Sequence, residues 1–155
     1  MVENIQDNAI ALIPDFVHNY SGCDPDFYSD FYSDFMETQT LDIDIFQDLR
    51  VAIGEDLEFS DLLTIYLNSA ENLIDTIQSA FVNQKASQLA LAAHSLKSTS
   101  ASIGAIRLSH ICKYLEKFGK TGQIPTSTEI LKLLSSEYNA MVIAVKVAII
   151  GFMAE

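Results

Sequence analysis

Apolar residues recur at steps of three and four along most of the chain from Leu41 onward, which is the period of amphipathic helices. A short helix is expected over 41–53, ended by Gly54, because glycine readily takes the left-handed conformation that closes a helix. The longest periodic run predicts one helix through the apolar positions Phe59, Leu62, Leu63, Tyr66, Ala70, Leu73, Ile77 and Phe81. After a turn at 83–85, a second long helix is expected to reach about Ser102.

The remainder of the chain predicts two more long helices. Gly104 interrupts the pattern, and apolar positions from Leu108 to Phe118 define the third helix, which is followed by the loop GKTGQIP. The segment Thr126–Glu129 (TSTE) has the spacing of a capping box and predicts the start of the fourth. No segment reads as a credible strand. Four long amphipathic helices with short connections predict an all-α, up-down antiparallel four-helix bundle.

Residues 1–39 are the least regular part of the sequence. A short apolar stretch, Ile5–Ile13, ends at Pro14 and predicts a brief helix. The tetrapeptide YSDF then occurs twice in tandem at 28–35, which is too short to indicate a repeat architecture. We interpret this part as an acidic, aromatic tether or flap, with a partner-binding motif as the alternative. The expected organisation is an extension at 1–39, containing one or more short helices, and a bundle domain at 40–155.

Charge is distributed unevenly over the 155 residues. The formal net charge of -12 argues against partners that are nucleic acids or anionic membrane surfaces. Residues 85–120, however, contain six basic residues and one acidic residue, Glu116. The N-terminus lacks the basic and long apolar segments of a secretory signal, and Cys23 and Cys112 form no CxxC pair. Two free thiols in a reducing cytoplasm are expected.

The locally basic segment contains His94, in the stretch LALAAHSLKSTSASIGA at 89–105. On a helix, the apolar stripe that includes Leu89, Ala93 and Leu96 lies almost opposite this histidine. The imidazole is therefore expected to face solvent, with Lys97 one turn further on. The side chains around it on the same face are short, namely Ser87, Ala90, Ser98 and Ala101.

The chemistry that suits His94 is nucleophilic attack on a phosphoryl group. A metal site needs several converging ligands, and no carboxylate or second histidine lies within one turn. A serine-type triad needs an acid that orients the ring and an oxyanion hole, and neither is indicated. A solvent-facing imidazole is largely unprotonated at neutral pH, and the Lys97 ammonium can offset the charge of an arriving phosphoryl group. No nucleotide-binding motif is present, so a carrier is predicted and not a kinase.

The segment HSLKSTSASIGAIRLSHICKYLE, residues 94–116, resembles the signature of the histidine-containing phosphotransfer (HPt) domains of two-component phosphorelays. In that family the histidine is followed by x-Leu-Lys-Gly/Ser, then by a glycine, and then by a Leu…Cys…Leu-Glu helix. The matching positions are His94, Leu96, Lys97, Ser98, Gly104, Ala105, Leu108, Cys112, Leu115 and Glu116. Ser98 stands where many members have glycine, and the similarity in helix pattern extends over 41–153.

The resemblance implies that His94 accepts a phosphoryl group from a receiver-domain aspartate and passes it to another receiver. The implied partners are response-regulator receiver domains, a hybrid sensor histidine kinase, or both, in the cytoplasm. We expect no cofactor and no metal site in this chain, since the receiver would bring Mg²⁺. Gly104 is expected to be structural, and the partner-docking surface is expected to comprise Ser87, Ala90, Leu91, Ser98 and Ala101.

Two other functions remain open at this level. The chain could be a non-catalytic interaction or dimerisation bundle that does not use His94, or a phosphoacceptor module separated from a chemotaxis-type kinase. A second HxxK pattern, His110 with Lys113, is followed by the bulky Tyr114, and His110 is interpreted as an ordinary surface residue.

The C-terminal helix is predicted to have a second apolar face. Met141, Val145, Ala148 and Phe152 supply the stripe that a bundle needs, whereas Ile143, Val147 and Ile150 project elsewhere. The apolar run from Ala140 to Met153 is too short to span a bilayer, so no membrane insertion is expected. Either the segment Ile5–Phe16 or a second copy of the chain is expected to cover this face. The first option, and hence a monomer, is favoured over a dimer through the C-terminal helix.

Overall fold

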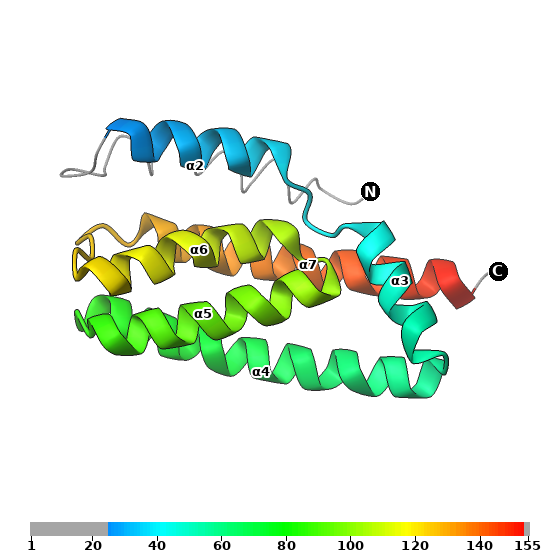
Figure 1. Cartoon of the computed structure of the whole chain (residues 1–155). Coiled ribbons are helices and arrows are strands. Elements are labelled where there is room, and N and C mark those ends of the chain that lie inside the picture. Colours follow the sequence, from blue (N-terminus) through cyan, green and yellow to red (C-terminus); the bar gives the residue numbers. More distant parts are fainter. Residues whose placement is uncertain (1–24, 154–155) are drawn as a thin grey trace.

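The computed structural model describes residues 25–153, and within that range the regular elements are all helices, joined by short connections (Figure 1). The helices are α2 (Pro25–Glu37), α3 (Ile43–Ile53), α4 (Asp56–Val82), α5 (Ala86–Ile103), α6 (Ile106–Thr121) and α7 (Glu129–Met153). The helices α4 to α7 form the predicted antiparallel bundle, α2 lies along α6, and α3 crosses one end of the bundle. The predicted fold class is confirmed, including an additional N-terminal helix.

Glycines end two of the helices where the sequence predicted a break. Gly54 follows α3 and Gly104 follows α5, with φ values of 84° and 92° that favour glycine. Gly104 is also constrained sterically, because a Cβ atom there would lie 2.7 Å from the backbone oxygen of Asp42. The predicted capping box is wrong in register. The helix α7 begins at Glu129 itself, whose amide donates to Ser127 Oγ at 3.5 Å.

The apolar stripes of the four bundle helices meet in one core. Fully or almost fully buried side chains come from every bundle helix, among them Leu63, Ile77, Leu89, Leu96, Leu108, Leu115, Leu134 and Met141. Inside this core, the Tyr66 hydroxyl and Ser100 Oγ form a hydrogen bond at 2.7 Å. At the far end of α7, the Phe152 ring stacks on Phe46, and the Arg50 guanidinium lies 4.3 Å from the centre of the same ring. These contacts fix α3 on the end of the bundle.

The tandem YSDF sequence belongs to α2 and packs on the bundle. A four-residue period places equivalent residues on one helix face, so Phe31 and Phe35 both insert against α6 and are completely buried. The Phe31 ring stacks on His110 and meets Tyr114 edge-on. This part of the extension is therefore an ordered helix. The proposal that Ile5–Phe16 covers the last helix concerns residues outside the described range.

A buried polar cluster ties the α2–α3 connection to the bundle. Arg107 Nη2 donates to the oxygen of Thr38 at 2.7 Å, and the Arg107 amide donates to the oxygen of Gln39 at 3.1 Å. Glu137 on α7 is fully buried nearby. Burial raises the pKa of Glu137 to about 7, against the opposing effects of Thr40 and Arg107.

α7 is the one helix in the described range that is long and apolar enough, by length and composition, to cross a membrane. Core helices of globular bundles share these properties, and the face of α7 that carries Leu133, Met141 and Val145 is buried. Met141, Val145 and Ala148 point inward as predicted, whereas Ile143, Val147 and Ile150 form an exposed strip. We therefore assign α7 to the bundle core.

Replacing Glu137 by glutamine should remove a pH dependence of stability. The folded-state pKa of about 7 lies above the unfolded value of 4.5, so the wild-type free energy of unfolding falls as pH rises from about 4.5 through 7. The free energy of unfolding of the Glu137→Gln variant should be higher than that of wild type by roughly 2–3 kcal/mol at pH 8. The two free energies should be equal near pH 4.5. Urea denaturation at both pH values measures this, with the exposed Glu58→Gln as control. An equal difference at both pH values would contradict the assignment.

Candidate functional site

His94 projects outward from the middle of α5. Leu89, Ala93 and Leu96 are completely buried on the opposite side of the helix, and the His94 side chain is 60% exposed. The predicted orientation is confirmed. Helical spacing also places Thr99 toward the core, but the structure exposes Thr99 and buries Ser100 instead, where Ser100 forms a hydrogen bond with Tyr66.

The backbones of α5 and α6 approach each other closely beside His94. A Cβ atom on Gly119 would lie 2.5 Å from the amide nitrogen of Ala90 and 2.7 Å from the oxygen of Ala86. Ser109 Oγ adds a hydrogen bond to the backbone oxygen of Lys97 at 2.9 Å. Small residues at the crossing therefore let side chains of α6 reach His94, which lies one turn after Ala90.

Glu116 on α6 is the side chain that reaches the ring. Its carboxylate is only 4% exposed, and Oε1 lies 3.0 Å from His94 Nδ1. The same oxygen lies 2.8 Å from Lys120 Nζ, and Oε2 forms an ion pair with Lys97 Nζ. One nearly buried carboxylate thus joins the histidine to two lysines.

These contacts fix the state of both the carboxyl group and the ring. Burial by itself would raise the pKa of Glu116, but the hydrogen bonds from Lys120, Lys97 and His94 lower it to about 2. Glu116 is therefore ionised at neutral pH and can only accept hydrogen bonds. Nδ1 of His94 must then carry the proton, which leaves the lone pair on Nε2.

Glu116 and Lys120 are the residues of this site to which the sequence reasoning assigned no role. Helical periodicity brings only residues within about one turn of His94 beside it, whereas Glu116 is 22 residues further along the chain and lies on another helix. The expectation that no acid orients the ring is wrong for this reason. The available signal was Glu116 itself, the sole acidic residue within the basic segment 85–120.

The surface around His94 is open. Ser87, Leu91, Ser98 and Ala101 are exposed, and Leu91 is the most exposed large apolar residue of α5 at 71%. Ala90 is half-buried, because it lies at the crossing with Gly119. Gly104 does not reach this surface and serves the turn between α5 and α6.

His110 has a different environment, and its interpretation as a surface residue is wrong. Helix α2 covers it, so that its side chain is 9% exposed and stacks on Phe31. Nε2 lies 3.9 Å from Asp34 Oδ2, and burial lowers the pKa of the ring. The sequence pattern did not predict this burial, because the segment that forms α2 was interpreted as a tether or flap and not as a helix packed on α6.

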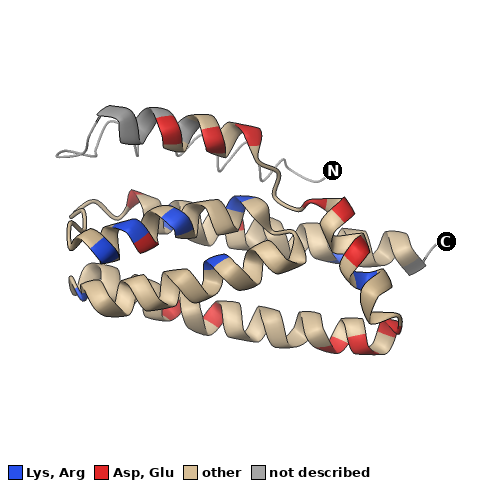
Figure 2. Cartoon of the chain, in the orientation of Figure 1, with Lys and Arg blue, Asp and Glu red and all other residues tan. Residues whose placement is uncertain are grey.

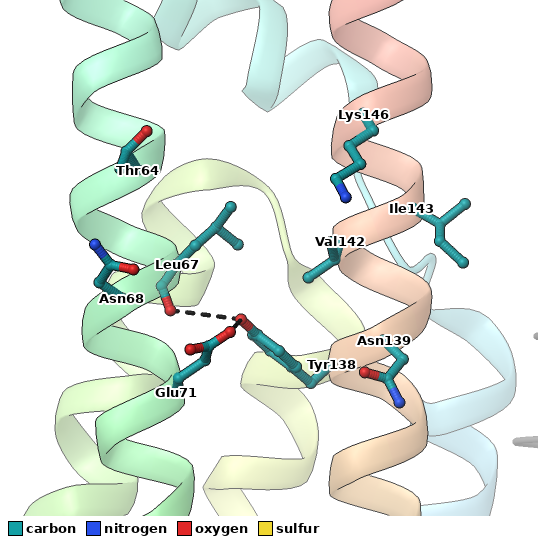
Figure 3. A pocket seen from close by; sticks show the side chains of 9 residues that line it. All are labelled: Thr64, Leu67, Asn68, Glu71, Tyr138, Asn139, Val142, Ile143 and Lys146. Atoms are coloured by element: carbon teal, nitrogen blue, oxygen red, sulfur yellow. Dashed lines mark hydrogen bonds between the residues drawn. The ribbon is translucent and has the colours of Figure 1, made fainter.

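A groove lies away from His94, on two other helices of the bundle. This groove of about 570 Å³ runs between α4 and α7, where Tyr138 donates to Glu71 Oε1 at 3.1 Å (Figure 3). Its other lining residues are Thr64, Leu67, Asn68, Asn139, Val142, Ile143 and Lys146. Among residues 25–153, no group of three or more histidine, cysteine or carboxylate side chains is placed to hold a metal ion.

The chain belongs to the Hpt domain family. A model of this family matches residues 61–146, from α4 through most of α7, which is more than half of the chain. The protein is accordingly a phosphocarrier of phosphorelay signalling, a histidine-containing phosphotransfer protein.

Solved structures show the same fold. The chain is similar to histidine-containing phosphotransfer protein B from Pseudomonas aeruginosa PAO1, with 26% sequence identity and a TM-score of 0.63, covering 69% of this chain and 91% of that one. It is also similar to the histidine-containing phosphotransfer protein MtHPt2 from Medicago truncatula, with 24% identity and a TM-score of 0.60, covering 78% and 84% respectively. No curated protein sequence matches this chain significantly.

Replacing Gly119 by alanine should disrupt the site through the helix crossing. The added methyl group meets backbone atoms of Ala86 and Ala90, which cannot rotate away, so α5 and α6 must separate. We expect a loss of about 1–3 kcal/mol of stability and a weaker hydrogen bond between Glu116 and His94. Denaturation and the ¹⁵N shifts of the His94 ring measure the two effects. The matched control is Gly151→Ala, since a Cβ atom there has no neighbour within 4 Å; an unchanged Gly119→Ala variant would contradict the argument.

Proposed function

We propose that His94 is the phosphoacceptor and that Nε2 is the attacking atom. The observation that carries this proposal is the hydrogen bond between Nδ1 and the ionised Glu116, on a ring that is 60% exposed. A fixed tautomer presents the Nε2 lone pair for attack.

The proposed step needs no external base. The Nε2 lone pair attacks phosphorus of the receiver's aspartyl phosphate, the N–P bond forms, and the O–P bond breaks so that aspartate leaves as a carboxylate. The proton on Nδ1 stays in place, and the ring becomes cationic. Glu116 stabilises that cation across the 3.0 Å contact. Passing the group to another receiver reverses the step.

Lys97 offsets the charge of the phosphoryl group in this proposal. Its ammonium pairs with Glu116 beside the ring, which holds it close to His94. Ser87, Ala90, Leu91, Ser98 and Ala101 form the proposed docking surface, which is small and uncharged enough for a receiver's acidic pocket to close over the ring. That pocket would bring the Mg²⁺ ion.

The proposed partners are receiver domains, a hybrid sensor histidine kinase, or both, and the proposed compartment is the cytoplasm. We propose a monomer, with a dimer through the exposed strip of Ile143, Val147 and Ile150 as the alternative. An interaction module that leaves His94 unused is the competing function. The ion-paired carboxylate on the His94 ring favours the phosphocarrier, because a module of that kind has no need of an oriented ring.

Replacing His94 by glutamine should abolish labelling by a phosphorylated receiver domain while the fold stays intact, since the side chain makes no core contact. The label on wild type should be acid-labile and alkali-stable. His110→Gln is the control and should still take up label, although it should unfold more easily because it lies under Phe31. Label on the His94→Gln variant would place the acceptor at another residue, and an unlabelled wild type would support the competing function.

Replacing Ser98 by leucine tests the docking surface. Ser98 is exposed one turn after His94, so a branched apolar side chain there would stand in the path of a receiver. We expect transfer from a receiver to slow by at least about tenfold, equivalent to ~1.4 kcal/mol, and phosphorylation by the small donor phosphoramidate to change little. Equal slowing with both donors would show a distortion of the site instead.

A further inference from the structure

The charges around Glu116 do not cancel. The carboxylate carries one negative charge, and both Lys97 and Lys120 form ion pairs with it. Lys97 alone would neutralise the carboxylate and leave the site without net charge. Lys120 therefore adds a surplus positive charge beside the His94 ring. An incoming phosphoryl group is anionic and is attracted only by such a surplus.

Lys120 differs from its neighbours on α6. Lys113 and Lys117 are also exposed on this helix, which carries most of the basic residues of the bundle (Figure 2). In the described part of the chain neither of them forms an ion pair with a carboxylate, and the Lys113 ammonium lies 5.8 Å from the centre of the Tyr114 ring. Lys120 alone among the three binds the oxygen that also holds His94 Nδ1.

The pairing of Lys120 is also not an ordinary exposed ion pair between residues four apart on a helix. Such pairs usually join two solvated side chains that are screened by salt. Here the Glu116 side chain is 4% exposed whereas the Lys120 side chain is 67% exposed. Glu116 holds the ammonium in place through one hydrogen bond, and the other two N–H donors of the flexible lysine side chain can turn toward an anion at the ring.

We propose that Lys120 is a second charge-supplying residue of the phosphotransfer site, acting together with Lys97 to stabilise the phosphoryl group on His94. This inference rests on the proposed role of His94. It explains why a carboxylate can lie against the acceptor ring without repelling the anionic donor. It also makes the site a product of two helices, because Lys97 comes from α5 and Lys120 from α6.

The test compares Lys120→Gln, Lys120→Arg and the control Lys117→Gln by their rates of labelling with phosphoramidate. We expect Lys120→Gln to react about three- to tenfold more slowly at low ionic strength, since the group is partly solvated. Lys120→Arg should keep the wild-type rate within about twofold, and so should Lys117→Gln. Because salt screens exposed charges, the deficit of Lys120→Gln should shrink in 0.5 M salt to less than about twofold.

Three results would overturn the inference. These are a wild-type rate for Lys120→Gln, an equal slowing of Lys117→Gln, and a deficit that does not respond to salt. Because Lys120 also stabilises the nearly buried Glu116, thermal unfolding of Lys120→Gln is measured in parallel. A cooperative transition well above the assay temperature separates a charge effect from a folding defect. Failure of the proposed function has a different signature, because wild type would then take up no label or His94→Gln would still take it up.

Discussion

The burial of one carboxylate, Glu116, between α5 and α6 is the constraint on which the site depends. A nearly buried anion is tolerated only when cations and hydrogen-bond donors surround it. Lys97, Lys120 and His94 meet this requirement. The same contacts decide which nitrogen of the ring is protonated and where the lone pair points. These contacts form because Gly119 lets the backbones of α5 and α6 approach closely. The helix packing and the arrangement of the site therefore depend on the same glycine.

Two faces of helix α6 make different contacts, which explains why the two HxxK sequences, at His94 and at His110, have different environments. The face with Glu116 and Lys120 meets the exposed His94 of α5, whereas the face with Arg107, His110 and Tyr114 receives α2. His110 has a lysine three residues on, as His94 has, but it is buried under Phe31. Exposure, which no HxxK pattern specifies, separates the proposed acceptor His94 from the packed ring of His110.

The N-terminal part of the chain is joined to the bundle by polar as well as apolar contacts. The Arg107 guanidinium stacks on Phe35 and donates to the backbone oxygen of Thr38. Its positive charge also acts on the buried Glu137, where it opposes the rise of the pKa that burial causes. Arg107 makes its hydrogen bonds to the backbone oxygens of Thr38 and Gln39 only in this arrangement, and an alternative packing would lose them. These contacts therefore fix α2 in one position on α6, on a different face of that helix from Glu116.

The sequence by itself determined the bundle, the helix ends at Gly54 and Gly104, and the outward orientation of His94. Each depends on local periodicity or on the conformational freedom of one residue type. The tertiary structure decided what lies against each exposed position. Glu116 reaches His94 across 22 residues, and α2 covers His110 across more than 70. Such contacts depend on how helices cross and on which side chains are small enough at the crossing, and helical periodicity within one segment does not encode either.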